Sequence, residues 1–194
     1  DWSSDVCSSD LTLPLSAYSF QVGLIQSLEE RKVMEAVPFL QQSLTSPNME
    51  VRLAVIHALG LLPDIGSAPL LWNIMEGSRA ENRAALHAYL SLAEALLEKG
   101  ESANAHALFA RFLTVSLTPS ERCAALVGLA KSEPNTSSQL LWEAFGASDH
   151  EVKGLAVRLL AENPSAETTQ KLLSALPLGD TTLHIALKIG RAHV

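Results

Sequence analysis

The chain has 194 residues, with 14 lysines and arginines against 21 aspartates and glutamates, for a formal net charge of -7. This acidic balance argues against nucleic-acid binding, because a phosphate backbone is recognised by a basic surface. No apolar run approaches the roughly 18 residues that a membrane span needs, and two cysteines are too few for a disulfide scaffold. The 47% hydrophobic content predicts a folded chain with a substantial core.

The two ends of the chain are related to each other at the level of DNA. Residues 5–11 and 188–194 can be encoded, in frame, by the opposite strands of one short segment. That nucleotide segment resembles a short-read sequencing adapter, so we expect residues 1–11 and 188–194 to be adapter-derived tails. The natural sequence is then expected to be a fragment of a longer protein, within residues 12–187.

Between these ends the sequence repeats itself, with a period of roughly 30 to 40 residues. A shift of 31 residues places Glu50 on Glu81, and a shift of 70 superposes residues 70–72 on 140–142. Such offsets correspond to one and two periods of a single structural unit. The chain is therefore predicted to be an array of repeats.

Each repeat is predicted to contain two helices. In the first clear repeat, residues 35–44 and 49–62 carry apolar residues at helical spacing, and Pro47 and Asn48 separate them. No segment alternates with period two, so we expect essentially no sheet. The same pattern predicts further helices, in chain order, at 68–75, 81–99, 102–113, 120–131, 137–145, 151–162, 167–176 and from 181 onward.

Residues 51–60 begin with Val51 and Arg52, continue through alanines and end with Leu59 and Gly60. This segment resembles the second helix of a HEAT repeat, and residues 149–153 resemble the start of the same helix. The chain is thus similar to the HEAT-repeat (armadillo-like) family, of bacterial type. The resemblance implies an all-α fold: a right-handed α-solenoid of stacked antiparallel helix pairs, a HEAT/ARM-like superhelix with about five repeats, spanning 12–187 as a single unit.

The middle of the array has a different spacing of apolar and small residues. It resembles a tetratricopeptide repeat, and we expect a TPR-like hairpin at about 85–118 within the array. The positions that carry this resemblance are Tyr89, Leu92, Ala93, Leu96, Gly100, Ala105, Phe109 and Phe112.

The sequence lacks the common catalytic, nucleotide-binding and zinc-binding motifs, so we expect no catalytic residue, no cofactor and no metal. Cys123 lies among small and apolar residues and is predicted to be a buried structural thiol rather than a nucleophile. His57 and His87 occupy nearly equivalent places in successive repeats. They could contribute to a metal site, but three or four ligands are needed, and polar surface positions are the favoured interpretation.

Basic residues recur along the second helices. They could form a ridge that binds a phosphate or an acidic partner, but the favoured interpretation is that four of them pair with acids or carbonyls between repeats: Arg52, Arg83, Arg122 and Lys153. Arg158 then joins His57 and His87 as a possible partner-contact face. Trp72 and Trp142 share one repeat position, and we expect them to lie in the core rather than to form stacking platforms.

The resemblance implies a non-catalytic scaffold or protein–protein interaction module that binds another protein or a neighbouring domain of its own chain. The alternative is an array that is attached to an enzyme or acts as one, similar to bilin lyases, or accessory to a sugar-processing domain such as a 3-keto-disaccharide hydrolase. A DNA glycosylase is disfavoured by the acidic charge. Apolar residues near both ends, including Leu13, Leu15, Phe20 and Leu183, predict that the fragment self-associates through uncapped ends.

Overall fold

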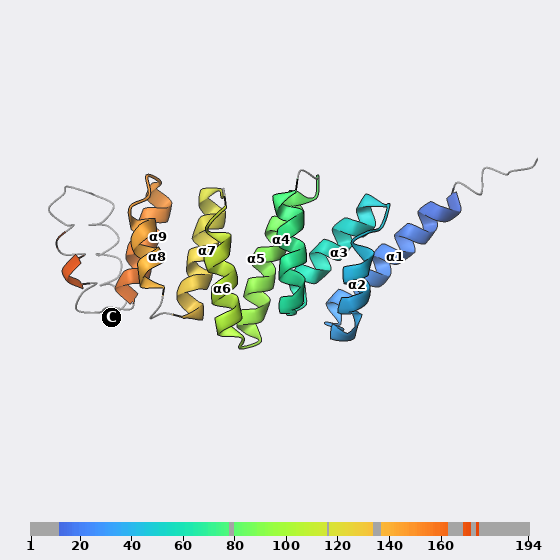
Figure 1. Ribbon diagram of the computed structural model, residues 1–194, viewed down its shortest axis with the longest axis horizontal. Coiled ribbons are helices and arrows are strands. Elements are labelled where there is room, and N and C mark those ends of the chain that lie inside the picture. Colours follow the sequence, from blue (N-terminus) through green and yellow to red (C-terminus); the bar gives the residue numbers. More distant parts are fainter. Residues whose placement is uncertain are drawn as a thin grey trace, which may run out of the picture. The chain divides into compact units, whose positions relative to one another are not determined.

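The structure is a computed structural model of the chain (Figure 1). It describes residues 12–77, 80–115, 117–133, 137–162, 169–171 and 174, and the side chains from residue 17 onward. Every regular element in these residues is a helix, which confirms the predicted all-α fold. The chain divides into two compact units, Asp1–Lys99 and Gly100–Val194.

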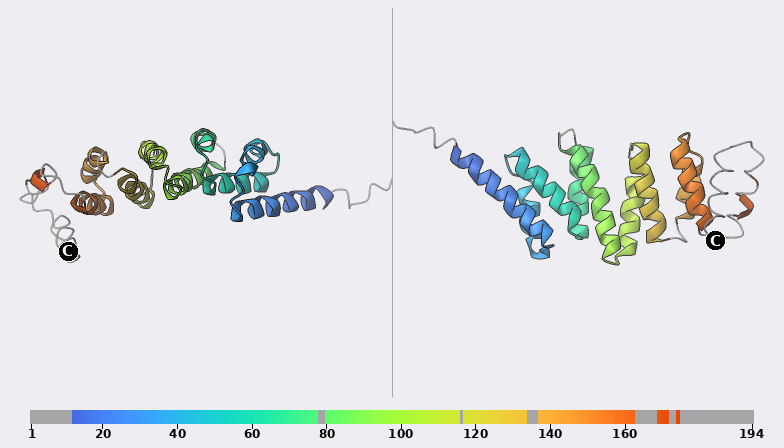
Figure 2. Two further views of the ribbon diagram at one scale, coloured as in Figure 1. Left: turned by 90° about the horizontal axis from the view of Figure 1, so that it is seen from below. Right: turned by 180° about the vertical axis from the view of Figure 1, so that it is seen from behind.

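In its described residues, the first unit holds five α-helices in two layers (Figure 2). Helices α1, α3 and α5 form one layer, in which α3 packs against both of its neighbours, while α2 packs on α3 and α4 on α5. Short 3-10 turns, Met34–Ala36 and Ile65–Ser67, lead into α2 and α4. The α-helices are α1 (Thr12–Glu30), α2 (Val37–Ser43), α3 (Met49–Leu61), α4 (Ala68–Glu76) and α5 (Asn82–Glu98).

The second unit repeats the same arrangement in its described residues. Helix α6 packs on α7 and α8 on α9, and α7 and α9 lie side by side. Consecutive packing of helix pairs within each unit confirms a helical-repeat, solenoid-type fold. The helices are α6 (Ser102–Phe112), α7 (Pro119–Ser132), α8 (Ser138–Phe145) and α9 (His150–Glu162).

Helix α1 is an element that the sequence pattern did not predict. It occupies the same layer as α3 and α5 and therefore stands where the second helix of a preceding pair would be. The predicted helices at 167–176 and from 181 lie outside the described residues, apart from helical residues at 169–171 and 174, and so do both predicted tails. The handedness, the number of repeats and the TPR-like hairpin at 85–118, which spans the boundary between the units, stay predictions.

The second helices begin at capping residues. The Asn48 side chain accepts hydrogen bonds from the backbone N–H groups of Glu50 (2.8 Å) and Val51 (3.1 Å). Asp149, at the equivalent position of a later repeat, accepts from Glu151 and Val152, both at 3.0 Å. These bonds satisfy donors that the first helical turn leaves without partners, which is why both helices start where the sequence predicts.

The core of each unit is built where helices approach closely. In the first unit, a Cβ placed on Gly60 would lie 2.7 Å from the Ala88 Cα, so α3 and α5 are in backbone contact there. In the second unit, Gly128 of α7 lies directly under the Phe109 ring of α6. Leu59, one of the apolar residues at helical spacing in 49–62, is fully buried.

The two repeat-related tryptophans differ in burial. Trp72 is buried and packs edge-on against Tyr89, with ring centroids 5.2 Å apart, which confirms its predicted place in the core. Trp142 is half-buried, packs on the edge of the second unit's core and contacts Phe145 at 5.5 Å. This repeat position therefore contacts the core in both units, but its tryptophan side chain is buried only in the first.

Candidate functional site

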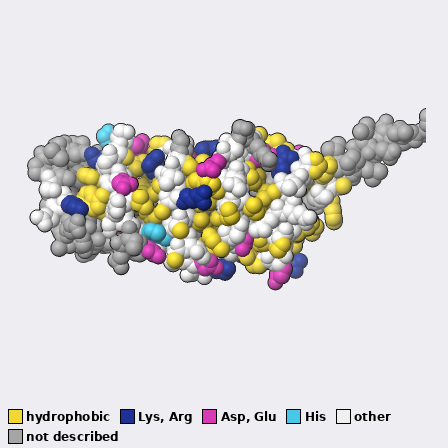
Figure 3. Space-filling view, viewed as in Figure 1, with side chains coloured by type: hydrophobic (Ala, Val, Ile, Leu, Met, Phe, Trp, Pro, Cys, Tyr) yellow, Lys and Arg dark blue, Asp and Glu magenta, His cyan; other side chains and the backbone are white. Residues whose placement is uncertain are grey.

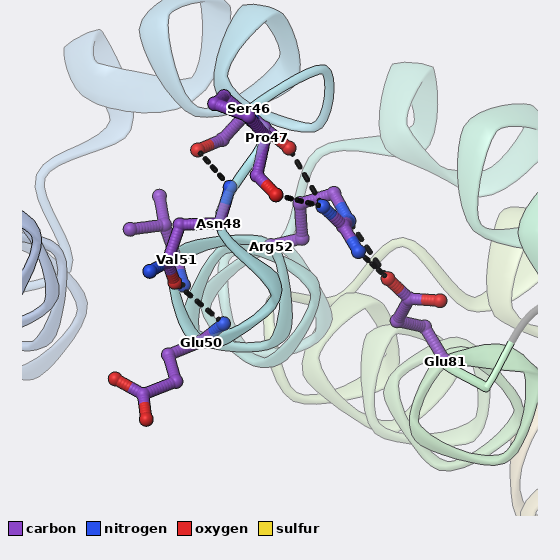
Figure 4. Close-up of polar contacts among 7 residues, drawn as sticks. All are labelled: Ser46, Pro47, Asn48, Glu50, Val51, Arg52 and Glu81. Atoms are coloured by element: carbon purple, nitrogen blue, oxygen red, sulfur yellow. Dashed lines mark hydrogen bonds and ion pairs between the residues drawn. The ribbon is translucent and has the colours of Figure 1, made fainter.

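Arg52 ties together three segments of the first unit (Figure 4). Its Nη1 donates to the backbone carbonyls of Ser46 (2.7 Å) and Pro47 (3.1 Å), and its Nε donates to Glu81 Oε1 (2.7 Å). Glu81, just before α5, is only 4% exposed. The predicted pairing of Arg52 with an acid and with carbonyls between repeats is confirmed, and this cluster is structural rather than available to a partner.

The equivalent basic residues in later repeats are placed differently. Lys153 of α9 lies over the Phe145 ring, with its Nζ 5.3 Å from the centroid. Arg83 is exposed on α5, and Arg122 is half-buried on α7. For Arg83, Arg122 and Lys153, pairing with acids or carbonyls between repeats stays a prediction.

His57 and His87 both belong to the first unit, on the adjacent helices α3 and α5, and both are exposed. His57 Nδ1 lies 2.9 Å from Glu29 Oε2, and its side chain is 69% exposed while that of Glu29 is 13% exposed. This contact joins α1 to α3. Glu29 carries no signal in the sequence, because it is 28 residues from His57 and lies in the helix that was not predicted.

Arg158 lies in the second unit and the two histidines lie in the first, so a face shared by all three residues stays a prediction. It lines a groove of about 390 Å³ between α7 and α9. The other residues that line this groove are Val127, Ala130, Lys131, Leu155, Leu159 and Glu162. On each helix the lining residues are three or four positions apart, so one face of α7 lies opposite one face of α9. The sequence alone does not predict that these two faces meet.

Cys123 is half-buried on α7 rather than fully buried. Burial raises the pKa of its thiol, and the carboxylates of Glu151 and Asp149 raise it further, while the Arg158 guanidinium partly offsets them. A raised thiol pKa lowers the fraction of reactive thiolate. Among the described residues no group of three or more histidines, cysteines or acids is placed to hold a metal ion.

Large apolar side chains reach the surface of the first unit. The most exposed is Phe20 of α1, at 72%, and the others are Leu24, Phe39, Met49, Leu61 and Ile65. On the face shown in Figure 3, acidic and basic side chains of the described residues are scattered among apolar ones. No large surface of a single charge is visible there. The side chains of Leu13, Leu15 and Leu183 lie outside the described residues.

Comparisons with known proteins agree with the repeat architecture. The family model of HEAT repeats matches residues 16–91, from α1 into α5. No curated protein and no solved structure matches the chain. In the part of the chain that the structure describes, no helix has both the length and the apolar character to cross a membrane. The segment 16–91 is therefore similar to HEAT repeats, as its helix pairs indicate.

Proposed function

We propose that the chain is a non-catalytic scaffold that binds a protein partner, or a neighbouring domain of its own chain, through exposed side chains of its second helices. The observation that carries this proposal is the placement of His57 and His87. Two histidines at nearly equivalent repeat positions lie on packed neighbouring helices, and both are exposed.

Residues other than these two histidines supply the core and the turn contacts of the first unit. Its core is supplied by buried leucines, alanines and aromatic residues, and its turns are fastened by Arg52 and Asn48. An exposed histidine contributes little to stability but offers an apolar ring together with hydrogen-bonding nitrogens. Glu29 holds the His57 ring, so less conformational entropy would be lost when a partner binds it.

The proposal is tested with the full chain as an affinity bait and with binding assays on the purified components that it recovers. We expect a partner that binds the native chain and is lost with the double variant His57→Ala/His87→Ala. The matched control is His150→Ala, because His150 is an exposed histidine of the second unit. Equal binding by the double variant, with an unchanged circular dichroism spectrum, would remove the support for this face.

A further inference from the structure

The groove between α7 and α9 has an apolar floor and a charged rim. Ala130 and Leu159 are buried at its base, and Val127 and Leu155 are half-buried beside them. Ala130 is small, so it leaves open space where a longer side chain would fill the groove. With a volume of about 390 Å³, the groove lies near the lower end of the range seen for ligand sites.

Two cations stand at the rim, one from each helix. Lys131 of α7 and Arg158 of α9 are exposed, and neither forms a hydrogen bond or an ion pair with any residue that the structure describes. Glu162 is the acid among the lining residues, and the rim carries one net positive charge. The chain as a whole has a net charge of -7, so the charge of the rim is opposite in sign to that of the chain, and it lies beside an apolar surface.

We propose that this groove binds a segment of a partner protein that carries a carboxylate next to an apolar side chain. The apolar side chain would cover Ala130 and Leu159, and the carboxylate would lie between Lys131 and Arg158. Arginine can hold a carboxylate through two parallel hydrogen bonds, which adds geometric selectivity to charge attraction. The inference rests on the proposed function, since it gives the chemistry of a partner segment for the second unit.

The shape and charge of the groove favour a protein segment over other occupants. The groove is open along the rim, where Lys131, Arg158 and Glu162 are all exposed, so a segment bound there keeps part of its surface in solvent. Sites for small molecules usually enclose most of the ligand surface. A nucleic acid would need a wider basic surface than two cations with an acid beside them.

The experiment measures fluorescence anisotropy of a labelled peptide titrated with the full 194-residue chain. The probe peptide carries two leucines flanked by aspartates in a glycine–serine background. One comparison peptide has asparagine in place of aspartate, and the other has serine in place of leucine. We expect both comparison peptides to bind at least about tenfold more weakly than the probe, because each removes one of the two interactions.

Variants of the chain locate the site. Arg158→Gln and Lys131→Gln should each weaken probe binding by about tenfold, the effect expected for losing a hydrogen bond to a charged group. The matched control is Arg111→Gln, which removes an exposed arginine of α6 that does not line the groove. Ala130→Leu should abolish binding by filling the floor while both cations remain. Ala130→Leu can disturb packing. If that variant unfolds, the substitution of the exposed Arg158 by glutamine still tests whether the probe binds in the groove.

Several outcomes would overturn the proposal. The asparagine peptide could bind as well as the probe, or Arg111→Gln could weaken binding as much as Arg158→Gln. Octanoate binding as tightly as the peptide would remove the assignment to a protein segment. The double variant His57→Ala/His87→Ala should bind the probe normally. The two proposals can also be separated. If that variant loses partner capture while no form of the chain binds the peptide, the groove is not a binding site but the proposed function still holds.

Discussion

Gly60 is the residue at which α3 and α5 come into backbone contact. A Cβ there would lie 2.7 Å from the Ala88 Cα and 2.8 Å from its carbonyl oxygen, and backbone atoms cannot move aside as a flexible side chain can. We expect Gly60→Ala to lower the free energy of unfolding by about 1 to 3 kcal/mol, measured by urea denaturation. The control is Gly23→Ala in α1, where nothing lies within 4 Å of the added carbon.

The control should change stability in the opposite direction. Alanine favours a helix interior over glycine by about 1 kcal/mol, so Gly23→Ala should be slightly stabilising. Destabilisation of the same size by both variants would show that close approach at Ala88 is not the cause.

Cys123 should react slowly with alkylating reagents at neutral pH. Its thiol pKa is raised, first by burial and then by Glu151 and Asp149, so the alkylation rate should reach half of its maximum at a higher pH in the folded chain than in the unfolded chain. The measurement uses iodoacetamide on a Cys7→Ser background, which leaves one thiol. Because the Arg158 cation lowers this pKa, Arg158→Gln should move the midpoint further up.

The control for this profile is Arg111→Gln, which removes the same charge from α6. A midpoint in the native chain at or below that of the unfolded chain would contradict the prediction. So would a downward shift on removing Arg158, because loss of a nearby cation disfavours the thiolate.

At the scale of elements, the end of α1 contains a strained residue. Lys32 has a φ of 50°, and the hydrogen bonds from Lys32 N to Glu29 O (2.9 Å) and from Val33 N to Leu28 O (3.0 Å) form a Schellman motif. Glycine is the usual residue at this position, since a side chain is strained in the left-handed region. We expect Lys32→Gly to raise the free energy of unfolding by about 0.5 to 1 kcal/mol.

Arg31→Gly is the comparison for this variant. Arg31 precedes Lys32 and does not have a positive φ, so glycine there adds only flexibility to the unfolded chain and should destabilise. Denaturation curves in which both variants lose stability would argue against strain at Lys32.

The contact between Arg52 and Glu81 joins α3 to the residue just before α5. Removing the guanidinium leaves a carboxylate that is only 4% exposed, so Arg52→Gln should cost about 1.5 to 3 kcal/mol. A double-mutant cycle with Glu81→Gln isolates the coupling between the two side chains. The control Arg31→Gln, an exposed arginine, should change stability by less than about 0.5 kcal/mol. A coupling energy near zero would mean that the ion pair does not stabilise the contact between repeats.

At the scale of the whole molecule, we expect the chain to self-associate through α1. Phe20 and Leu24 are 72% and 43% exposed, and residues four apart share one face of a helix. The sedimentation coefficient should therefore rise with protein concentration, and Phe20→Ser/Leu24→Ser should remove this dependence. The control is Phe39→Ser on α2, where an equally large apolar side chain is 52% exposed. A concentration-independent native chain, or an equal effect of Phe39→Ser, would contradict this role of α1.

Local patterns in the sequence were enough to predict the helix pairs, their capping residues and much of the core. Asn48 and Leu59 were predictable because caps and helical periodicity depend on residues close together in the chain. Helix α1 escaped prediction because Pro14 and Gly23 weaken the local helical signal, and its packing on α3 stabilises it instead.

Which helix faces meet and which remain open could not be predicted from these local patterns. The contact of Glu29 with His57, the backbone contact of Gly60 with Ala88 and the place of Lys131 opposite Arg158 all join residues 27 or 28 positions apart. Such contacts depend on how each helix is rotated about its axis and how closely its neighbour approaches. Those quantities are set by the fit of many side chains at once. The periodicity of a helix therefore predicts which of its residues are buried. It does not predict which residue of a neighbouring helix lies beside an exposed residue.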